Sequence, residues 1–316
     1  MPADKLFAIA SRRSPLALAQ ARLVQAMISR AASIGAEHAP IRDYVSSGDR
    51  NLSGSLADVG GKGLFTKEIE DALLSGVARF AVHSMKDMPP ESPPGLVTAA
   101  IPAREDPRDV FISPVTASPW DLPQGARVGT ASVRRAAQLL ARRPDLKTAP
   151  LRGNVGTRLE KLKRGEADAT FLALAGLKRL GMEAHATMIM GADEMLPAAG
   201  QGALCVQTRE DDNEARAIAA LFNCSKTSLC VQMERAFLAG LDGSCRTPIA
   251  ALAVIEGGEV RFRGELLSLN GAQVFRASRI MPYTDGSDVD IINAGAEAAV
   301  ELRAKAGDDF FKALGA

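Results

Sequence analysis

Aromatic residues are scarce in this chain, and neither sign of charge is in excess. Phe, Trp and Tyr make up 4% of the 316 residues, and 38 basic residues balance 37 acidic ones to a formal net charge of +1. Proteins that bind nucleic acid without sequence preference usually carry more positive charge and more aromatic side chains for stacking on bases. The composition therefore predicts no nucleic-acid partner.

Long apolar runs and paired cysteines are absent as well. No apolar stretch approaches the roughly 20 residues of a membrane-spanning helix, and no basic segment followed by an apolar one opens the chain as in a signal peptide. The four cysteines form no Cys-x-x-Cys pair and no zinc-like set with the three histidines. We therefore expect a soluble, cytoplasmic protein with no membrane partner and no metal site.

Arginine is abundant, and its placement is informative. It outnumbers lysine 27 to 11, and three segments put it between a strand-like run and a helical pattern: residues 11–15 (Ser-Arg-Arg-Ser-Pro), 129–135 (Gly-Thr-Ala-Ser-Val-Arg-Arg) and 152–158 (Arg-Gly-Asn-Val-Gly-Thr-Arg). A helix start carries partial positive charge and unpaired N–H groups, so arginine there is costly unless an anion meets it. The pattern predicts a ligand with several negative charges.

Strand and helix patterns alternate over the first two thirds of the chain. Ser14 and Pro15 are typical of a helix start, and buried-strand patterns occur at residues 79–82, 148–151 and 169–174. A proline-rich stretch, residues 89–107, indicates a crossing between lobes. This rhythm predicts mainly parallel sheets with ligands at the carboxyl ends of strands.

The pattern changes after about residue 223. A helix ends at Gly240 and Gly243, and strands are predicted at 249–255, 260–269 and 273–281, with a closing helix at 291–304. The short glycine-containing joins between the strands are typical of antiparallel hairpins. We expect a separate α+β domain with a three-stranded antiparallel sheet.

Eight motifs, in order, resemble the porphobilinogen deaminase family, also called the hydroxymethylbilane synthases. They span residues 11–20 (SRRSPLALAQ), 60–68 (GGKGLFTKE), 81–87 (AVHSMKD), 104–109 (REDPRD), 128–135 (VGTASVRR), 151–159 (LRGNVGTRL), 196–203 (LPAAGQGA) and 243–249 (GSCRTPI). A single motif of this kind is weak, but eight in order are specific.

The resemblance implies an α/β fold with two lobes like those of type II periplasmic binding proteins, with mixed, mainly parallel sheets. Domain 1 would comprise residues 1–103 and 201–222, and domain 2 residues 104–200. Domain 3, residues 223–316, would be the smaller α+β domain. No long apolar seam indicates an assembly interface, so we expect a monomer.

The resemblance also implies an activity, a small-molecule substrate and a cofactor. The family joins four porphobilinogen molecules head to tail, releases ammonia each time, and frees hydroxymethylbilane by hydrolysis. The chain grows on a dipyrromethane cofactor that a thioether holds to one cysteine, and Cys245 matches that position. We expect Cys205, Cys224 and Cys230 to be inert, small apolar residues.

Porphobilinogen carries an acetate and a propionate, which accounts for the arginines. The family match assigns the cofactor to Cys245, Lys86, Arg12, Ser14, Thr130, Ser132, Arg134, Arg135, Arg152 and Arg158. It assigns the substrate to Arg12, Arg152 and Arg158, with Lys62, Phe65 and Gln20. Arg13 is expected to be a solvated surface charge, and Arg142 and Arg143 to complement a helix C-terminus.

Asp87 is the predicted catalytic residue. Loss of ammonia leaves a cationic pyrrole, and a carboxylate facing the pyrrole N–H groups would stabilise that charge and move protons. Lys86 beside it would bind a carboxylate. His83 is expected to be a packed, hydrogen-bonded histidine rather than an acid or base.

Three positions depart from the family pattern, and two other functions compete. Asp58 stands where the family often has Lys, Ala131 where it often has Ser, and Ser244 where it often has Gly.

A solute-binding receptor of the type II periplasmic fold would also have two lobes with anion-binding helix starts, but it needs neither Asp87 nor a tethering cysteine. A phosphate-ester or nucleotide-binding regulator would show a Walker or Gly-x-Gly-x-x-Gly motif, and the sequence has neither.

Overall fold

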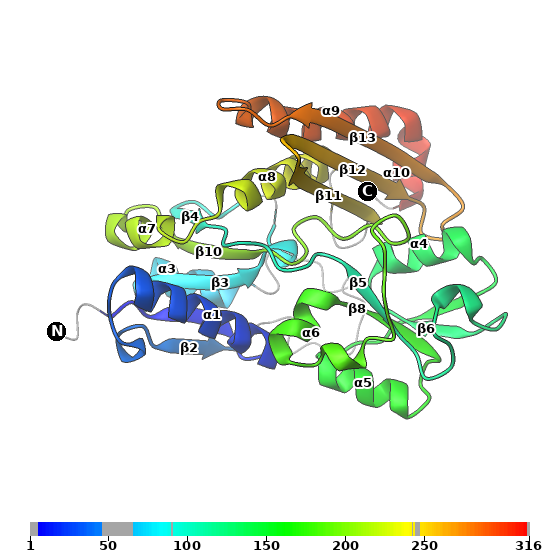
Figure 1. The fold of residues 1–316 in the computed structure, drawn as a ribbon, viewed down its shortest axis with the longest axis horizontal. Coiled ribbons are helices and arrows are strands. Elements are labelled where there is room, and N and C mark those ends of the chain that lie inside the picture. Colours follow the sequence, from blue (N-terminus) through cyan, green and yellow to red (C-terminus); the bar gives the residue numbers. More distant parts are fainter. Residues whose placement is uncertain (1–5, 46–65, 90, 242, 244–246, 315–316) are drawn as a thin grey trace. The chain divides into compact units, whose positions relative to one another are not determined.

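The computed structural model describes residues 6–45, 66–89, 91–241, 243 and 247–314. The chain divides into two compact units, the first formed by Met1–Glu105 and Gly202–Ser228 and the second by Asp106–Gln201 and Leu229–Ala316. Figure 1 follows the chain through its helices and strands. Lys62, Phe65 and Cys245 of the predicted site lie outside the described residues, as do Asp58 and Ser244.

The first unit contains a mixed sheet of five strands in the order β2-β1-β3-β10-β4. The strands are β1 (Ile9–Arg12), β2 (Ile41–Tyr44), β3 (Phe80–Ser84), β4 (Leu96–Ala100) and β10 (Leu204–Arg209). β1 is parallel to β2 and β3, whereas β10 is antiparallel to both β3 and β4. Four strands therefore point the same way, and only β10 is reversed.

Helices cover both faces of this first sheet. Helices α1 (Pro15–Ala31) and α7 (Asn213–Ala220) pack on one face with residues such as Ile9, Phe80 and Val206. Helix α3 (Lys67–Leu74) packs on the other face, against Ala10 and Ala81. The faces alternate along β1 and β3 because successive side chains of a strand point to opposite sides.

The second unit contains a five-stranded sheet in the order β7-β6-β8-β5-β9. Its strands are β5 (Asp109–Ile112), β6 (Arg127–Gly129), β7 (Lys147–Ala149), β8 (Ala169–Ala173) and β9 (Met188–Ile189). Here β5 alone is reversed, since it is antiparallel to β8 and β9 while β6 is parallel to β7 and β8. Each reversed strand, β10 or β5, is the first strand after the chain has crossed from one unit to the other.

Three helices flank this second sheet. Helix α4 (Val133–Arg142) packs on one face through Leu139, which joins Phe111 and Phe171 of the sheet. Helices α5 (Val155–Lys163) and α6 (Leu174–Leu180) pack on the other face. This arrangement sets the first turn of α4 next to the start of β5.

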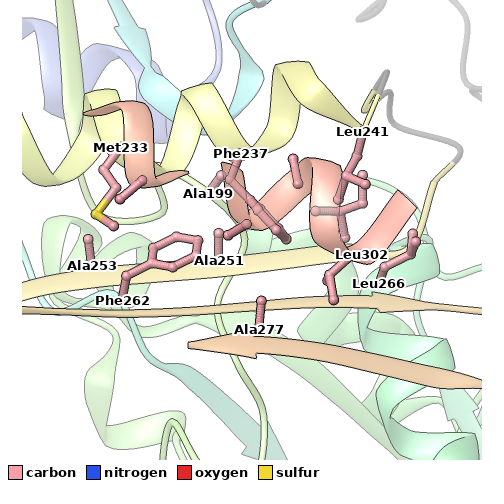
Figure 2. Packing of buried hydrophobic residues seen from close by; sticks show 14 of the residues in the cluster. Ala199, Met233, Phe237, Leu241, Ala251, Ala253, Phe262, Leu266, Ala277 and Leu302 are labelled. Atoms are coloured by element: carbon pink, nitrogen blue, oxygen red, sulfur yellow. The ribbon is translucent and has the colours of Figure 1, made fainter. Parts of the chain in front are cut away.

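A third sheet, also in the second unit, is antiparallel with the order β11-β12-β13. It consists of β11 (Ile249–Glu256), β12 (Glu259–Leu267) and β13 (Val274–Pro282). Its apolar face packs on helices α8 (Ser225–Gly240), α9 (Asp288–Ala306) and α10 (Asp308–Leu314). Figure 2 shows Met233 and Phe237 of α8 facing Phe262 of β12 in this core.

The α/β fold with two mixed, mainly parallel sheets and a third antiparallel sheet is confirmed. The strand expected at 148–151 is β7, which ends at Ala149, and the proline-rich stretch contains β4. The finer division into three domains remains a prediction. Within the described residues, no helix is long and apolar enough to cross a membrane.

Candidate functional site

The three arginine-bearing segments do begin helices, as predicted. Ser14, Ser132 and Asn154 cap α1, α4 and α5, and their side chains accept hydrogen bonds from Ala17 N, Arg135 N and Thr157 N. None of the three helices has an acidic residue in its first turn. Their N-terminal partial charge is therefore reinforced by arginine rather than offset by carboxylates.

In the first unit, Gln20 joins α1 to the carboxyl end of β3. Its side chain is 3% exposed, and Nε2 donates to Ser84 Oγ at 2.9 Å. Arg12 is half-buried at the end of the neighbouring strand β1. The ends of β1 and β3 and the start of α1 thus form one polar edge.

Asp87 lies at this edge, directly after β3. A single 3₁₀ turn, η3 (Met85–Asp87), follows the strand and is anchored by buried Met85, whose N–H donates to Ala203 O at 3.0 Å. Lys86 and Asp87 are both exposed. Among the described residues, none hydrogen-bonds or ion-pairs with the Asp87 carboxylate.

His83 is buried in β3, four residues before Asp87, and its Nε2 has no hydrogen-bond partner among the described residues. Burial lowers the pKa of His83 from 6.5 to about 4, and the positive charge of Arg12 acts in the same direction. The imidazole is therefore neutral near pH 7. His83 is thus packed, as expected, and does not exchange protons near neutrality, but no described residue gives its Nε2 the hydrogen bond that was also expected.

In the second unit, Arg134 and Arg135 are almost fully buried at the first turn of α4. They are 5% and 6% exposed, and both bind Asp109, which is 0% exposed. Asp109 Oδ2 accepts from Arg134 Nη2 at 2.8 Å, and Oδ1 accepts from Arg135 Nη2 at 2.7 Å. Burial opposes ionisation of Asp109, but the two guanidinium groups outweigh it and hold its pKa below the usual value.

This cluster has two positive charges for one negative charge. Arg134 Nη1 and Arg135 Nη1 donate to the backbone carbonyls of Leu196 and Phe171, while the buried Nε of Arg134 has no partner among the described residues. Burial lowers the pKa of Arg134, although Asp109 offsets part of this effect. An excess buried cation with an orphaned donor fits a site for an anionic group.

The sequence alone did not reveal Asp109 as the partner of these two arginines. Asp109 ends the motif at residues 104–109, which carried part of the family resemblance, but a carboxylate in a Pro-Arg-Asp segment has no local signal for burial. It becomes a partner because β5 lies beside β8 under α4. The pairing therefore depends on the sheet order.

The other predicted binding residues of the second unit differ in whether their side chains hydrogen-bond to nearby backbone. Thr130 Oγ1 accepts from Ser132 N at 3.1 Å, and Arg158 Nε donates to Gly153 O at 2.8 Å. Arg152 is half-buried in the loop before α5, and no described residue hydrogen-bonds or ion-pairs with its guanidinium.

The arginines expected to lie outside the site have contacts of their own. Exposed Arg13 pairs with Asp43. Arg142 lies over the Trp120 ring, with Cζ 5.2 Å from the ring centroid, and Arg143 donates to the carbonyls of Trp120 and Leu122. Arg143 therefore binds carbonyls of another segment, beyond the helix-end role expected for it.

Two family models match the chain. Residues 7–217 match "Porphobilinogen deaminase, dipyromethane cofactor binding domain", and residues 228–303 match "Porphobilinogen deaminase, C-terminal domain". The chain belongs to the porphobilinogen deaminase family. It is therefore a transferase of tetrapyrrole biosynthesis that uses a dipyrromethane cofactor, as the resemblance implied.

Curated relatives agree over nearly the whole length. Porphobilinogen deaminase of Nitrobacter winogradskyi is 50% identical over 98% of this chain and 96% of its own. That of Paracoccus denitrificans is 50% identical over 96% of this chain and 95% of its own. The chloroplastic enzyme of Oryza sativa subsp. japonica is 48% identical over 98% of this chain and 86% of its own.

Solved structures that the chain resembles include the methionine-binding protein MetQ, with a TM-score of 0.44 and 10% identity over 71% of this chain and 93% of that one. A putative methionine-binding lipoprotein from Bacillus subtilis has a TM-score of 0.42 and 13% identity over 71% of this chain and 92% of that one. Within the described residues, no group of three or more His, Cys, Asp or Glu side chains could hold a metal ion.

Proposed function

We propose that Asp87 is the central catalytic residue with which this chain condenses porphobilinogen, while arginines hold the carboxylates of substrate and cofactor. The observation that carries this assignment is an exposed carboxylate, free of partners among the described residues, on a short turn anchored after a buried strand. A surface aspartate is usually solvated or loosely paired. Here the anchored turn fixes the backbone at Asp87, and no described residue neutralises the carboxylate.

Asp87 acts on charge that develops during the reaction. Loss of ammonia from porphobilinogen leaves a cationic pyrrole, and the attacking pyrrole becomes positive before it loses its proton. A preorganised carboxylate stabilises both cations more than it stabilises the neutral substrate, which lowers the barrier. The same carboxylate accepts the proton that the attacking pyrrole loses once the new carbon–carbon bond has formed, and passes that proton to the ammonia already released or to solvent.

The dipyrromethane is assigned to Cys245, Lys86, Arg12, Ser14, Thr130, Ser132, Arg134, Arg135, Arg152 and Arg158. When bound, it supplies the primer to which the pyrrole units are joined. The side chains present fit such a group, because the Asp109 cluster keeps one excess positive charge and an orphaned Arg134 Nε. Arg12, Arg152 and Arg158 bind substrate carboxylates as well, with Lys62, Phe65 and Gln20.

We further assign the protein to the cytoplasm, as a monomer without a nucleic-acid partner. The net charge of +1 and the 4% of aromatic residues support the last of these assignments, the absence of a nucleic-acid partner. Size-exclusion chromatography with light scattering tests the monomer directly.

The test of Asp87 compares two substitutions. Asp87→Asn removes the charge at constant shape, so porphobilinogen consumption should fall by orders of magnitude while the melting temperature is unchanged. Asp87→Glu keeps the charge but moves it by a methylene, so slow turnover should remain. Intact-protein mass spectrometry after brief exposure to substrate counts the bound pyrroles in each variant.

Asp71→Asn is the matched control, because Asp71 is an exposed carboxylate of the same unit and pairs with Lys67 on α3. It should turn over at the normal rate. Normal turnover by Asp87→Asn would remove Asp87 from the mechanism.

A further inference from the structure

Asp109 is held by more than the two arginines. Gln201 Nε2 donates to Asp109 Oδ1 at 2.9 Å and to Pro107 O at 2.7 Å, and the Gln201 side chain is 1% exposed. Residues 106 and 201 are the points at which the chain enters the second unit and leaves it. One neutral amide therefore joins both crossing segments to the buried carboxylate.

The segment that ends at Gln201 also fixes helix α4. Leu196 O accepts from Arg134 Nη1 at 2.7 Å and from Gln138 Nε2 at 2.9 Å. Leu196 N donates back to Gln138 Oε1 at 2.7 Å. The backbone of this segment thus sets the position of the helix that carries the arginine pair.

The network of Arg134, Arg135, Asp109 and Gln201 carries a net positive charge, and the neutral side chain of Gln201 leaves that charge unchanged. Arg134 and Arg135 bring two positive charges and Asp109 one negative charge. Glu265 attracts Arg134 from farther away, but its carboxylate bonds to Arg276 Nε at 2.7 Å. Gln201 donates a hydrogen bond to Asp109 and adds no charge.

We propose that Asp109 is a positioning residue that orients Arg134 and Arg135, and that the neutral side chain of Gln201 holds the net charge of this buried set at +1, so that the set takes one carboxylate of the ligand. This inference rests on the proposed function, in which both arginines bind carboxylates. A carboxylate at position 201 would neutralise the set and compete with the ligand without removing any arginine. An apolar residue there would remove hydrogen bonds but leave the net charge unchanged.

The test therefore compares Gln201→Glu with Gln201→Leu in the purified holoenzyme. For Gln201→Glu we expect the KM for porphobilinogen to rise about tenfold or more, with a smaller change in kcat, and a lower fraction of protein carrying the dipyrromethane mass. For Gln201→Leu we expect a lower melting temperature but a KM within about twofold of normal, since the charge is retained.

Two further variants complete the design. Gln124→Glu adds the same charge at an exposed turn of the same unit and should leave KM unchanged. Gln138→Glu puts a carboxylate one helical turn from Arg134 while keeping an acceptor for Leu196 N, so it must also raise KM. This second variant keeps the test decisive if Gln201→Glu fails to fold.

An unchanged KM in folded Gln201→Glu, or an equal rise in Gln201→Leu, would overturn the inference. Arg158→Leu is measured in parallel because it tests the proposed function alone. If Arg158→Leu loses elongation while the KM of Gln201→Glu is unchanged, only the charge-setting role of Gln201 fails. If Arg158→Leu elongates normally and the KM of Gln201→Glu is also unchanged, the assignment of the arginines to ligand carboxylates fails as well.

Discussion

Four arginines assigned to ligand carboxylates differ in what they contact inside the protein. Arg134 and Arg135 share buried Asp109, whereas Arg158 has a backbone carbonyl as a partner and Arg152 has no partner among the described residues. Leucine at position 134 or 135 should therefore lower both stability and cofactor loading, because removing one member of a buried ion pair costs about 3–5 kcal/mol. Leucine at 152 or 158 should block elongation while changing the free energy of unfolding by less than about 1 kcal/mol.

Chemical denaturation and the mass distribution of bound pyrroles separate these two effects. Arg164→Leu is the control, since Arg164 is an exposed residue that pairs with Glu166 after α5, and it should be normal in both measurements. Equal destabilisation by all four substitutions would mean that Arg152 and Arg158 serve the fold rather than the ligand.

At the residue scale, the sequence predicts hydrogen bonds between residues close together in the chain, but not pairs between residues far apart in it. The cap Ser14 was predicted, because a cap bonds its own helix three residues away. The partners of Arg134 were not, since Asp109 lies 25 residues away and Leu196 lies 62 residues away. Such pairs depend on strand order, which one sequence does not contain.

At the scale of elements, the hairpin between β12 and β13 meets the backbone of α4. A Cβ on Gly271 would lie 2.4 Å from Ala141 N and 2.5 Å from Ala137 O, and the residue has φ +71°. Gly271→Ala should therefore force the hairpin away from the helix that carries the arginine pair. We expect a loss of unfolding free energy well above the roughly 1–2 kcal/mol that a left-handed backbone costs a non-glycine residue.

Gly258→Ala provides the comparison in urea unfolding. Gly258 also has a positive φ, +81°, in the turn between β11 and β12, but among the described residues no atom lies within 4 Å of the place that an alanine Cβ would take. It should show the backbone cost alone. Equal losses of unfolding free energy in the two alanine variants would mean that the hairpin can move away from α4 without destabilising the protein.

The elements themselves were predicted unevenly. The three strands of the antiparallel sheet and the helices α1 and α9 were found because their apolar periods are long and their turns carry glycine. Strand β4 was missed because it lies among prolines, and pairing with β10 outweighs the local signal. β10 itself returns to the first sheet from more than 100 residues beyond β4, a connection that periodicity does not show.

At the scale of the whole molecule, the arginines assigned to ligand carboxylates fall on both units. Arg12 lies at the end of the first sheet, and the Asp109 cluster and Arg152 lie on the second unit. Formal net charge is only +1, so these local excesses are offset elsewhere on the surface. A covalently held, multiply charged group is then expected to stabilise the folded chain as any ligand of the native state does.

Cys245→Ser tests this expectation together with the tether. The normal protein should exceed its sequence mass by one dipyrromethane, and Cys245→Ser should lack that adduct and all turnover. Because the variant lacks the carboxylates that the cofactor would bring to the arginines, it should also melt at a lower temperature than the holoenzyme. Cys224→Ser replaces a half-buried thiol that accepts from Thr227 Oγ1 at 3.3 Å, and it should keep both the adduct and the normal melting temperature.

Added citrate, a small tricarboxylate, should then raise the melting temperature of Cys245→Ser more than that of the holoenzyme, because it can occupy arginines that the adduct otherwise fills. Sodium chloride at equal ionic strength separates specific binding from screening, since it screens charges without bridging two guanidinium groups. If citrate and chloride act alike on both proteins, the arginines are already satisfied within the chain. An adduct that persists in Cys245→Ser would move the tether to another residue.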